Sequence, residues 1–127
     1  MFLGIDLGQK TTGLAISSGE LASPYKTITH KSLDDALAKV LAEINNLNAS
    51  AVVVGFVEGK IKPMFVNFAK KLQKQKPDLK IVLWDETLTS RQATETVVKL
   101  GIAKRRRAQK QHEVAAALIL QSYLDSR

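Results

Sequence analysis

The chain has 127 residues, of which 45% are apolar, and it contains no cysteine. This length predicts a single domain over residues 1–127 with a substantial core, and the missing cysteine excludes disulfides and thiolate zinc sites. Nineteen Lys and Arg against twelve Asp and Glu give a formal net charge of +7, which favours a nucleic-acid partner over a merely solvated cationic surface.

The apolar runs are no longer than a β-strand, so no membrane partner is expected. The first residues read as a strand rather than as a basic leader followed by an apolar signal region. Together with the missing cysteine, this pattern predicts a cytoplasmic location.

The first third of the chain predicts three strands, over Phe2–Leu7, Thr12–Ser17 and Leu21–Ile28. Because the connecting segments are short, these strands are expected to pair antiparallel. Pro24 cannot donate a ladder hydrogen bond, which places the third strand at a sheet edge or at a bulge.

Helices and strands alternate in the rest of the chain. A helix capped by Ser32 is followed by a strand at Ala51–Val54, whose lack of alternation predicts burial on both faces, as in a parallel strand. The later elements are a helix from Pro63, a strand at Lys80–Trp84, a helix capped by Thr89 or Ser90 and ending at Gly101, and a final helix at Gln109–Tyr123.

This order predicts an α/β fold with a mixed five-stranded sheet. The three-stranded meander forms the antiparallel part, and the first strand runs parallel to the strands at Ala51–Val54 and Lys80–Trp84. Helices are expected on both faces of this sheet.

Two acids follow strands of the predicted parallel part. Asp6 ends an apolar strand, and Glu86 follows the strand at Lys80–Trp84, about 10 Å away if the strand ending at Gly55 lies between them. Carboxylates at this edge are suited to Mg²⁺ or Mn²⁺ and to phosphodiester cleavage. Asp6 could instead bond turn amides, and Glu86 could cap a helix or face solvent.

The final helix offers a third candidate ligand. His112 shares a helix face with two small residues, Ala115 and Ala116, so this face can approach the sheet and bring the imidazole to the acids. Glu113 points about 100° away from it. The alternative is that His112 is an ordinary helix-start residue, and His30 is interpreted as a turn residue without a role.

Cations near the proposed site are candidate phosphate contacts rather than only a solvated surface. Aromatic residues make up 6% of the chain, so base stacking is not an evident binding mode. The candidate nucleic-acid-binding residues are Lys10, Lys104, Arg105, Arg106, Arg107 and Lys110.

Four segments in order carry a family resemblance over nearly the whole chain. They are Gly4-Ile5-Asp6-Leu7-Gly8 with Gly13-Leu14-Ala15-Ile16-Ser17, then Val53-Val54-Gly55, Asp85-Glu86-Thr87-Leu88-Thr89-Ser90, and Ala115 to Leu124. The chain thereby resembles the YqgF/RuvX family of the ribonuclease-H-like superfamily.

The resemblance implies a ribonuclease-H-like fold and a divalent-metal endonuclease of the bacterial cytoplasm. The implied role is maturation of the 5′ end of pre-16S ribosomal RNA, with Holliday-junction cleavage as the other proposal. The family's acidic triad falls on Asp6, Glu86 and position 112, which makes these the expected catalytic and metal-binding residues. The implied partner is pre-rRNA or branched DNA, bound by a monomer or a weak homodimer.

The sequence departs from the family pattern at position 112, where the family usually has aspartate. Thr11 and Thr87 stand where arginine is usual, and Ser18 stands where an acid is usual. Because an imidazole is neutral and softer than a carboxylate, we expect weaker Mg²⁺ binding and a relative preference for Mn²⁺.

Two other functions remain open. The altered triad is also consistent with a nucleic-acid-binding protein whose catalysis is weakened or lost. The segment Gly4–Thr12 also resembles the phosphate loop of actin-like ATPases, but those enclose the nucleotide between two such domains and this chain has one.

Overall fold

The computed structural model describes residues 1–89, 91–99 and 111–127, and the description below concerns these residues. The strands are β1 (Phe2–Leu7), β2 (Thr11–Ser17), β3 (Ala22–Thr29), β4 (Ala51–Phe56) and β5 (Lys80–Asp85). The helices are α1 (Leu33–Leu47), α2 (Lys62–Gln75), the short 3₁₀ helix η1 (Glu86–Leu88), α3 (Arg91–Lys99) and α5 (Gln111–Asp125).

The five strands form one sheet in the order β3-β2-β1-β4-β5. β1 pairs antiparallel with β2 and parallel with β4, and β4 pairs parallel with β5, which confirms the predicted mixed sheet. β3 lies at one edge, and its register with β2 shifts between Leu14 and Ala15, where Pro24 is the partner of Ala15. The expectation that Pro24 marks an edge or a bulge is therefore confirmed on both counts.

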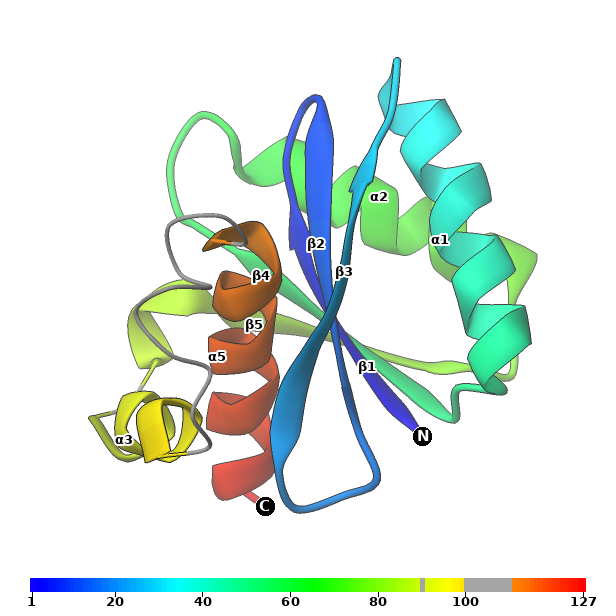
Figure 1. The fold of residues 1–127 in the computed structure, drawn as a ribbon. Coiled ribbons are helices and arrows are strands. Elements are labelled where there is room, and N and C mark those ends of the chain that lie inside the picture. The colour runs from blue at the N-terminus through cyan, green and yellow to red at the C-terminus, as the bar shows by residue number, and fades with distance from the viewer. Residues whose placement is uncertain (90, 100–110) are drawn as a thin grey trace.

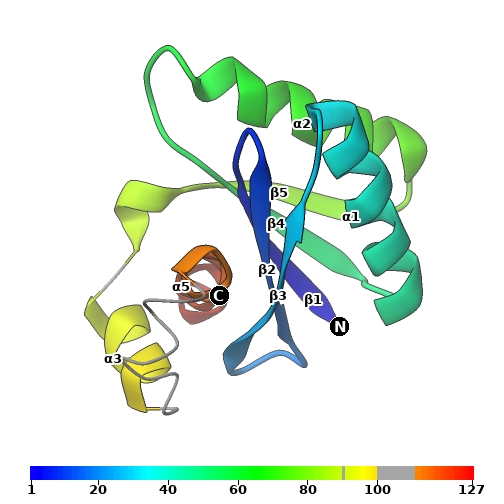
Figure 2. The same cartoon turned by 45° about the horizontal axis from the view of Figure 1, so that its top comes forward.

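Helices cover both faces of the sheet, with α1 and α2 on one side and α5 on the other (Figures 1 and 2). β4 contributes to both resulting cores, since Val52 and Val54 pack with the residues under α1 and α2 while Val53 packs under α5. This double coverage explains why the sequence of β4 shows no polar alternation. None of the described helices combines the length and apolar character that crossing a membrane requires.

His30 lies in the connection between β3 and α1, as predicted, but it is only 4% exposed and has structural contacts that the sequence did not indicate. Its Nδ1 lies 3.1 Å from the carbonyl oxygen of Ser32, and its Nε2 lies 2.8 Å from the hydroxyl oxygen of Thr12. The imidazole therefore ties the start of α1 to β2. Ser32 also caps α1 as predicted, because its hydroxyl accepts from the amide of Asp35.

Candidate functional site

Asp6 and Glu86 reach the same space from two different strands. Asp6 is the register partner of Gly13 in β2, so both residues face the side of the sheet covered by α5. Glu86 begins η1 directly after β5, and β4 separates β5 from β1. A β-carbon at Gly55 in β4 would lie 3.3 Å from Glu86 Oε1 and would collide with the side chain of Ile119. Glycine at this position leaves the room that Glu86 needs between the sheet and α5.

The carboxyl groups of Asp6 and Glu86 lie close enough to interact, and this proximity favours a proton on one of them. Burial raises the pKa of Glu86 to about 7, and the nearby charge of Asp6 raises it further in the same direction. Burial also raises the pKa of Asp6, although the neighbouring His112 and the hydrogen bond from Glu86 oppose that rise. Glu86 is therefore the acid of the pair for which burial and the neighbouring charge most favour the protonated form.

Asp85, the neighbour of Glu86, has a separate task. Its Oδ1 accepts from the amide of Thr87 at 2.9 Å and from the Thr87 hydroxyl at 2.8 Å, which caps η1. These two hydrogen bonds lower the pKa of Asp85. Asp85 therefore caps η1, while the side chain of Glu86 lies beside Gly55 and Asp6.

His112 joins the acids from the first turn of α5. Its Nδ1 lies 3.6 Å from Asp6 Oδ2, and its Nε2 lies 3.1 Å from the hydroxyl oxygen of Thr11. The helix comes very close to β2 here, because a β-carbon at Gly13 would overlap the carbonyl group of His112. Glu113 turns away as predicted, and its carboxylate accepts from the hydroxyl of Thr27 at 3.1 Å.

The residues suit a divalent cation in donor type, with two carboxylates and one imidazole nitrogen at the edge of the sheet. Within residues 1–89, 91–99 and 111–127, however, no three His, Asp or Glu side chains are arranged as a metal-binding group. Asp6 lies against Glu86 on one side and against His112 on the other. Two crowded acids of this kind require either a proton or a cation between them.

The family model described as RuvX, Holliday junction resolvase, matches residues 1–126 of the chain. The chain belongs to the RuvX family.

Relatives and solved structures agree with this family. The chain is 35% identical over 133 residues to a protein of Aster yellows witches'-broom phytoplasma and 34% identical over 134 residues to one of Acetivibrio thermocellus, each named "Putative pre-16S rRNA nuclease". The alignments cover 97% and 98% of this chain and 87% and 95% of the two relatives.

Two solved resolvases share the fold of this RuvX-family chain. Thermus thermophilus RuvC in complex with a Holliday junction substrate matches with a TM-score of 0.64 at 17% identity, covering 98% of this chain and 94% of that chain. The fowlpox virus Holliday junction resolvase also gives a TM-score of 0.64, at 13% identity, covering 98% and 97%. These likenesses confirm the ribonuclease-H-like fold expected from the sequence.

The candidate phosphate contacts of the RuvX-family chain are only partly described. Lys10 is exposed in the turn between β1 and β2. The other predicted contacts, Lys104, Arg105, Arg106, Arg107 and Lys110, lie outside the described residues.

Two residues beside the acids, Thr11 and Gly13, are not among the site residues predicted from the sequence. Thr11 was noted only as a departure from the family pattern. The signal that could have found both is the alternation along β2, which puts Thr11 and Gly13 on the same face. Because the partner of Gly13 is Asp6, this is the face that carries the acid.

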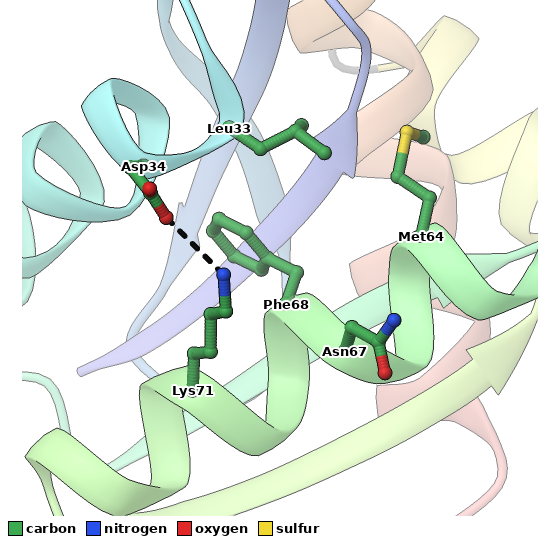
Figure 3. Close-up of a pocket in the computed structure, with 6 residues that line it drawn as sticks. All are labelled: Leu33, Asp34, Met64, Asn67, Phe68 and Lys71. Carbon is green, nitrogen blue, oxygen red and sulfur yellow. Dashed lines mark hydrogen bonds and ion pairs between the residues drawn. The ribbon is translucent and has the colours of Figure 1, made fainter.

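A separate small pocket of the RuvX-family chain, with a volume of about 140 Å³, lies between α1 and α2 (Figure 3). Its apolar wall includes Leu33, Met64 and Phe68, and an ion pair of 3.2 Å between Asp34 and Lys71 spans one side. The side chains of Asp34 and Lys71 are 81% and 59% exposed, so the pair adds little stability. The pocket lies across the sheet from Asp6 and does not belong to the acidic site.

The acid pair predicts a pH-dependent stability for the metal-free protein. The native pKa of Glu86, about 7, is above the ordinary value of 4.5, so the folded state binds more protons than the unfolded state between these limits. The free energy of unfolding should therefore fall as pH rises through this window, and Glu86→Gln should flatten the slope. Urea unfolding of both proteins at pH 5, 6, 7 and 8 measures this, and equal slopes would contradict the assignment.

Proposed function

We propose that the chain is a divalent-metal-dependent endonuclease for structured nucleic acid, and that its main role is maturation of the 5′ end of pre-16S ribosomal RNA. The observation that carries the proposal is the position of Asp6, which contacts Glu86 on one side and His112 on the other. Membership of the RuvX family, the names of the relatives and the formal charge of +7 support it. Holliday-junction cleavage is the other activity within the same proposal.

Asp6, Glu86 and Nδ1 of His112 would hold the cation, which activates water and neutralises charge on the phosphate when bound. On binding the cation, the carboxyl groups would be ionised, any proton on them going to solvent, and would supply negative charge, while the imidazole would favour Mn²⁺ over Mg²⁺. Contact between α5 and β2 at Gly13 holds the imidazole in place, and Ile119 closes the space beside Glu86. Lys10 and the cations at 104–107 and 110 would bind the nucleic-acid backbone.

The direct test incubates the protein with pre-16S rRNA and with four-way DNA junctions, each in Mg²⁺, in Mn²⁺ and in EDTA. The proposal expects metal-dependent cleavage of the rRNA precursor at its 5′ side, with the higher rate in Mn²⁺. Cleavage of the junctions but not of the rRNA precursor would identify branched DNA as the substrate. Absence of any metal-dependent product from either substrate would overturn the nuclease proposal.

A second candidate is a nucleic-acid-binding protein with weakened or lost catalysis. Its motivation is the imidazole of His112, which stands where the family usually has an acid. Such a protein would bind rRNA or junctions in the same assay but would give no cleavage product. Such a protein, like the nuclease, is proposed to act in the cytoplasm as a monomer or weak homodimer.

The His112→Asp variant is expected to bind Mg²⁺ about tenfold more tightly than the native protein, since a third carboxylate adds charge and a harder oxygen donor. Its relative preference for Mn²⁺ should fall. Isothermal titration with each metal measures both changes, and cleavage rates in the two metals provide an independent comparison. A native protein that cleaves faster in Mg²⁺ than in Mn²⁺ would contradict this expectation.

A further inference from the structure

The imidazole of His112 is held between two side chains of different chemistry. Nδ1 faces the carboxylate of Asp6 at 3.6 Å, and Nε2 faces the hydroxyl of Thr11 at 3.1 Å. The His112 side chain is 41% exposed, so contact with the core does not by itself hold the ring at one rotation. The orientation of the ring therefore depends on polar partners.

We propose that Thr11 is a positioning residue that directs Nδ1 of His112 toward Asp6 and keeps Nε2 outside the candidate metal site. The inference rests on the proposed function only in that the site takes a cation. Thr11 touches neither acid in any hydrogen bond that the described residues show, and it acts through the imidazole.

The backbone brings the two partners together. Thr11 and Gly13 lie on the same face of β2, two residues apart, and the carbonyl group of His112 packs directly against Gly13. This contact sets the height of the first turn of α5 above the strand. The Thr11 hydroxyl is then within reach of the ring edge opposite to Asp6.

A hydroxyl is suited to this position because it can both donate and accept a hydrogen bond. When Nδ1 carries the ring proton, it points to Asp6, and Nε2 can accept from the Thr11 hydroxyl. A cation held by Nδ1 would need its lone pair, so the ring proton would then be on Nε2, which would donate to Thr11, with the proton from Nδ1 lost to solvent and the one on Nε2 taken from solvent. Ligating histidines usually donate their second ring N–H to an oxygen acceptor, most often a carboxylate, a backbone carbonyl or water, and mutation of such a partner typically costs 10–100-fold in metal affinity or activity.

The other histidine, His30, also contacts a threonine and provides a control for the contact between Thr11 and His112. Its Nε2 lies 2.8 Å from the hydroxyl oxygen of Thr12, and its Nδ1 contacts the Ser32 carbonyl. Thr12 is the next residue along β2 and points to the opposite face, toward α1. Variants at Thr11 and Thr12 therefore remove the same chemical group from two different threonine–histidine pairs.

The test uses the full-length chain with ¹⁵N-labelled histidine and ¹¹³Cd²⁺ as a spectroscopic probe of the ligating nitrogen, together with Mn²⁺ affinity measured by electron paramagnetic resonance. The native protein should show ¹⁵N–¹¹³Cd coupling to Nδ1 of His112. Thr11→Val should weaken Mn²⁺ binding by roughly tenfold and spread or abolish the Nδ1 coupling. Thr11→Ser, which keeps the hydroxyl, should restore both.

Thr12→Val is the matched control, and it should change the signals of His30 while the Nδ1 coupling of His112 stays. Coupling through Nε2 in the native protein, no coupling to His112, or native affinity with unchanged Nδ1 coupling in Thr11→Val would each overturn the role of Thr11. Native Nδ1 coupling without cleavage of any nucleic acid would overturn the nuclease proposal and leave the role of Thr11 intact.

Discussion

Asp6→Asn is expected to lower metal-dependent cleavage at least about a hundredfold, which corresponds to a loss of about 3 kcal/mol in transition-state stabilisation. Asp6 is the acid that contacts both other candidate ligands, Glu86 and His112. Asparagine has nearly the same shape but no negative charge, so the change removes charge from the centre of the site with little change in packing. Single-turnover cleavage of the preferred substrate in Mn²⁺ measures the loss.

A measurement of stability distinguishes a loss of catalysis in Asp6→Asn from a loss of the folded state. Because burial raises the pKa of Asp6, its ionised form is disfavoured in the fold, and the Asp6→Asn variant should be at least as stable as the native protein at pH 8. Asp34→Asn is the matched control, since Asp34 is a highly exposed acid on α1, beyond the opposite face of the sheet. Native-like cleavage by Asp6→Asn, or an equal loss in Asp34→Asn, would refute the role assigned to Asp6.

Gly13→Ala is expected to lower the free energy of unfolding by about 3 kcal/mol, because the added methyl group overlaps the carbonyl group of His112 and backbone must move. The displacement should also separate His112 from Thr11 and Asp6, so Mn²⁺ affinity should fall in the protein that still folds. Urea unfolding and Mn²⁺ titration below the unfolding transition measure the two effects.

Gly59→Ala separates loss of stability from damage to the site. Gly59 has a φ of +115° and no neighbour within 4 Å of an added β-carbon, so alanine there strains the backbone without pushing another element. This control should lose stability while keeping Mn²⁺ affinity. If Gly13→Ala also binds Mn²⁺ as the native protein does, the close approach of α5 to β2 does not position His112.

Much of the architecture could be predicted because it depends on local and periodic properties. Pro24 lacks an amide hydrogen and was correctly expected at an edge or bulge, and the continuous apolar run in β4 predicted burial on both faces. The approach of Asp6 to Glu86 followed from a general rule, that parallel strands present their carboxyl ends at one edge. Contact between nucleic acid and the cations at 104–107 and 110 remains a prediction.

The order of apolar, polar, proline and glycine residues along the chain was therefore enough to define the sheet, its coverage by helices and the edge where acids collect. Only the folded arrangement revealed that His30 is buried against Thr12, that Asp6 lies against Glu86, and that the Thr11 hydroxyl contacts the imidazole of His112. The physical reason is distance along the chain. Thr11 and His112 are 101 positions apart, and their contact depends on how closely α5 packs against Gly13, which no local pattern encodes.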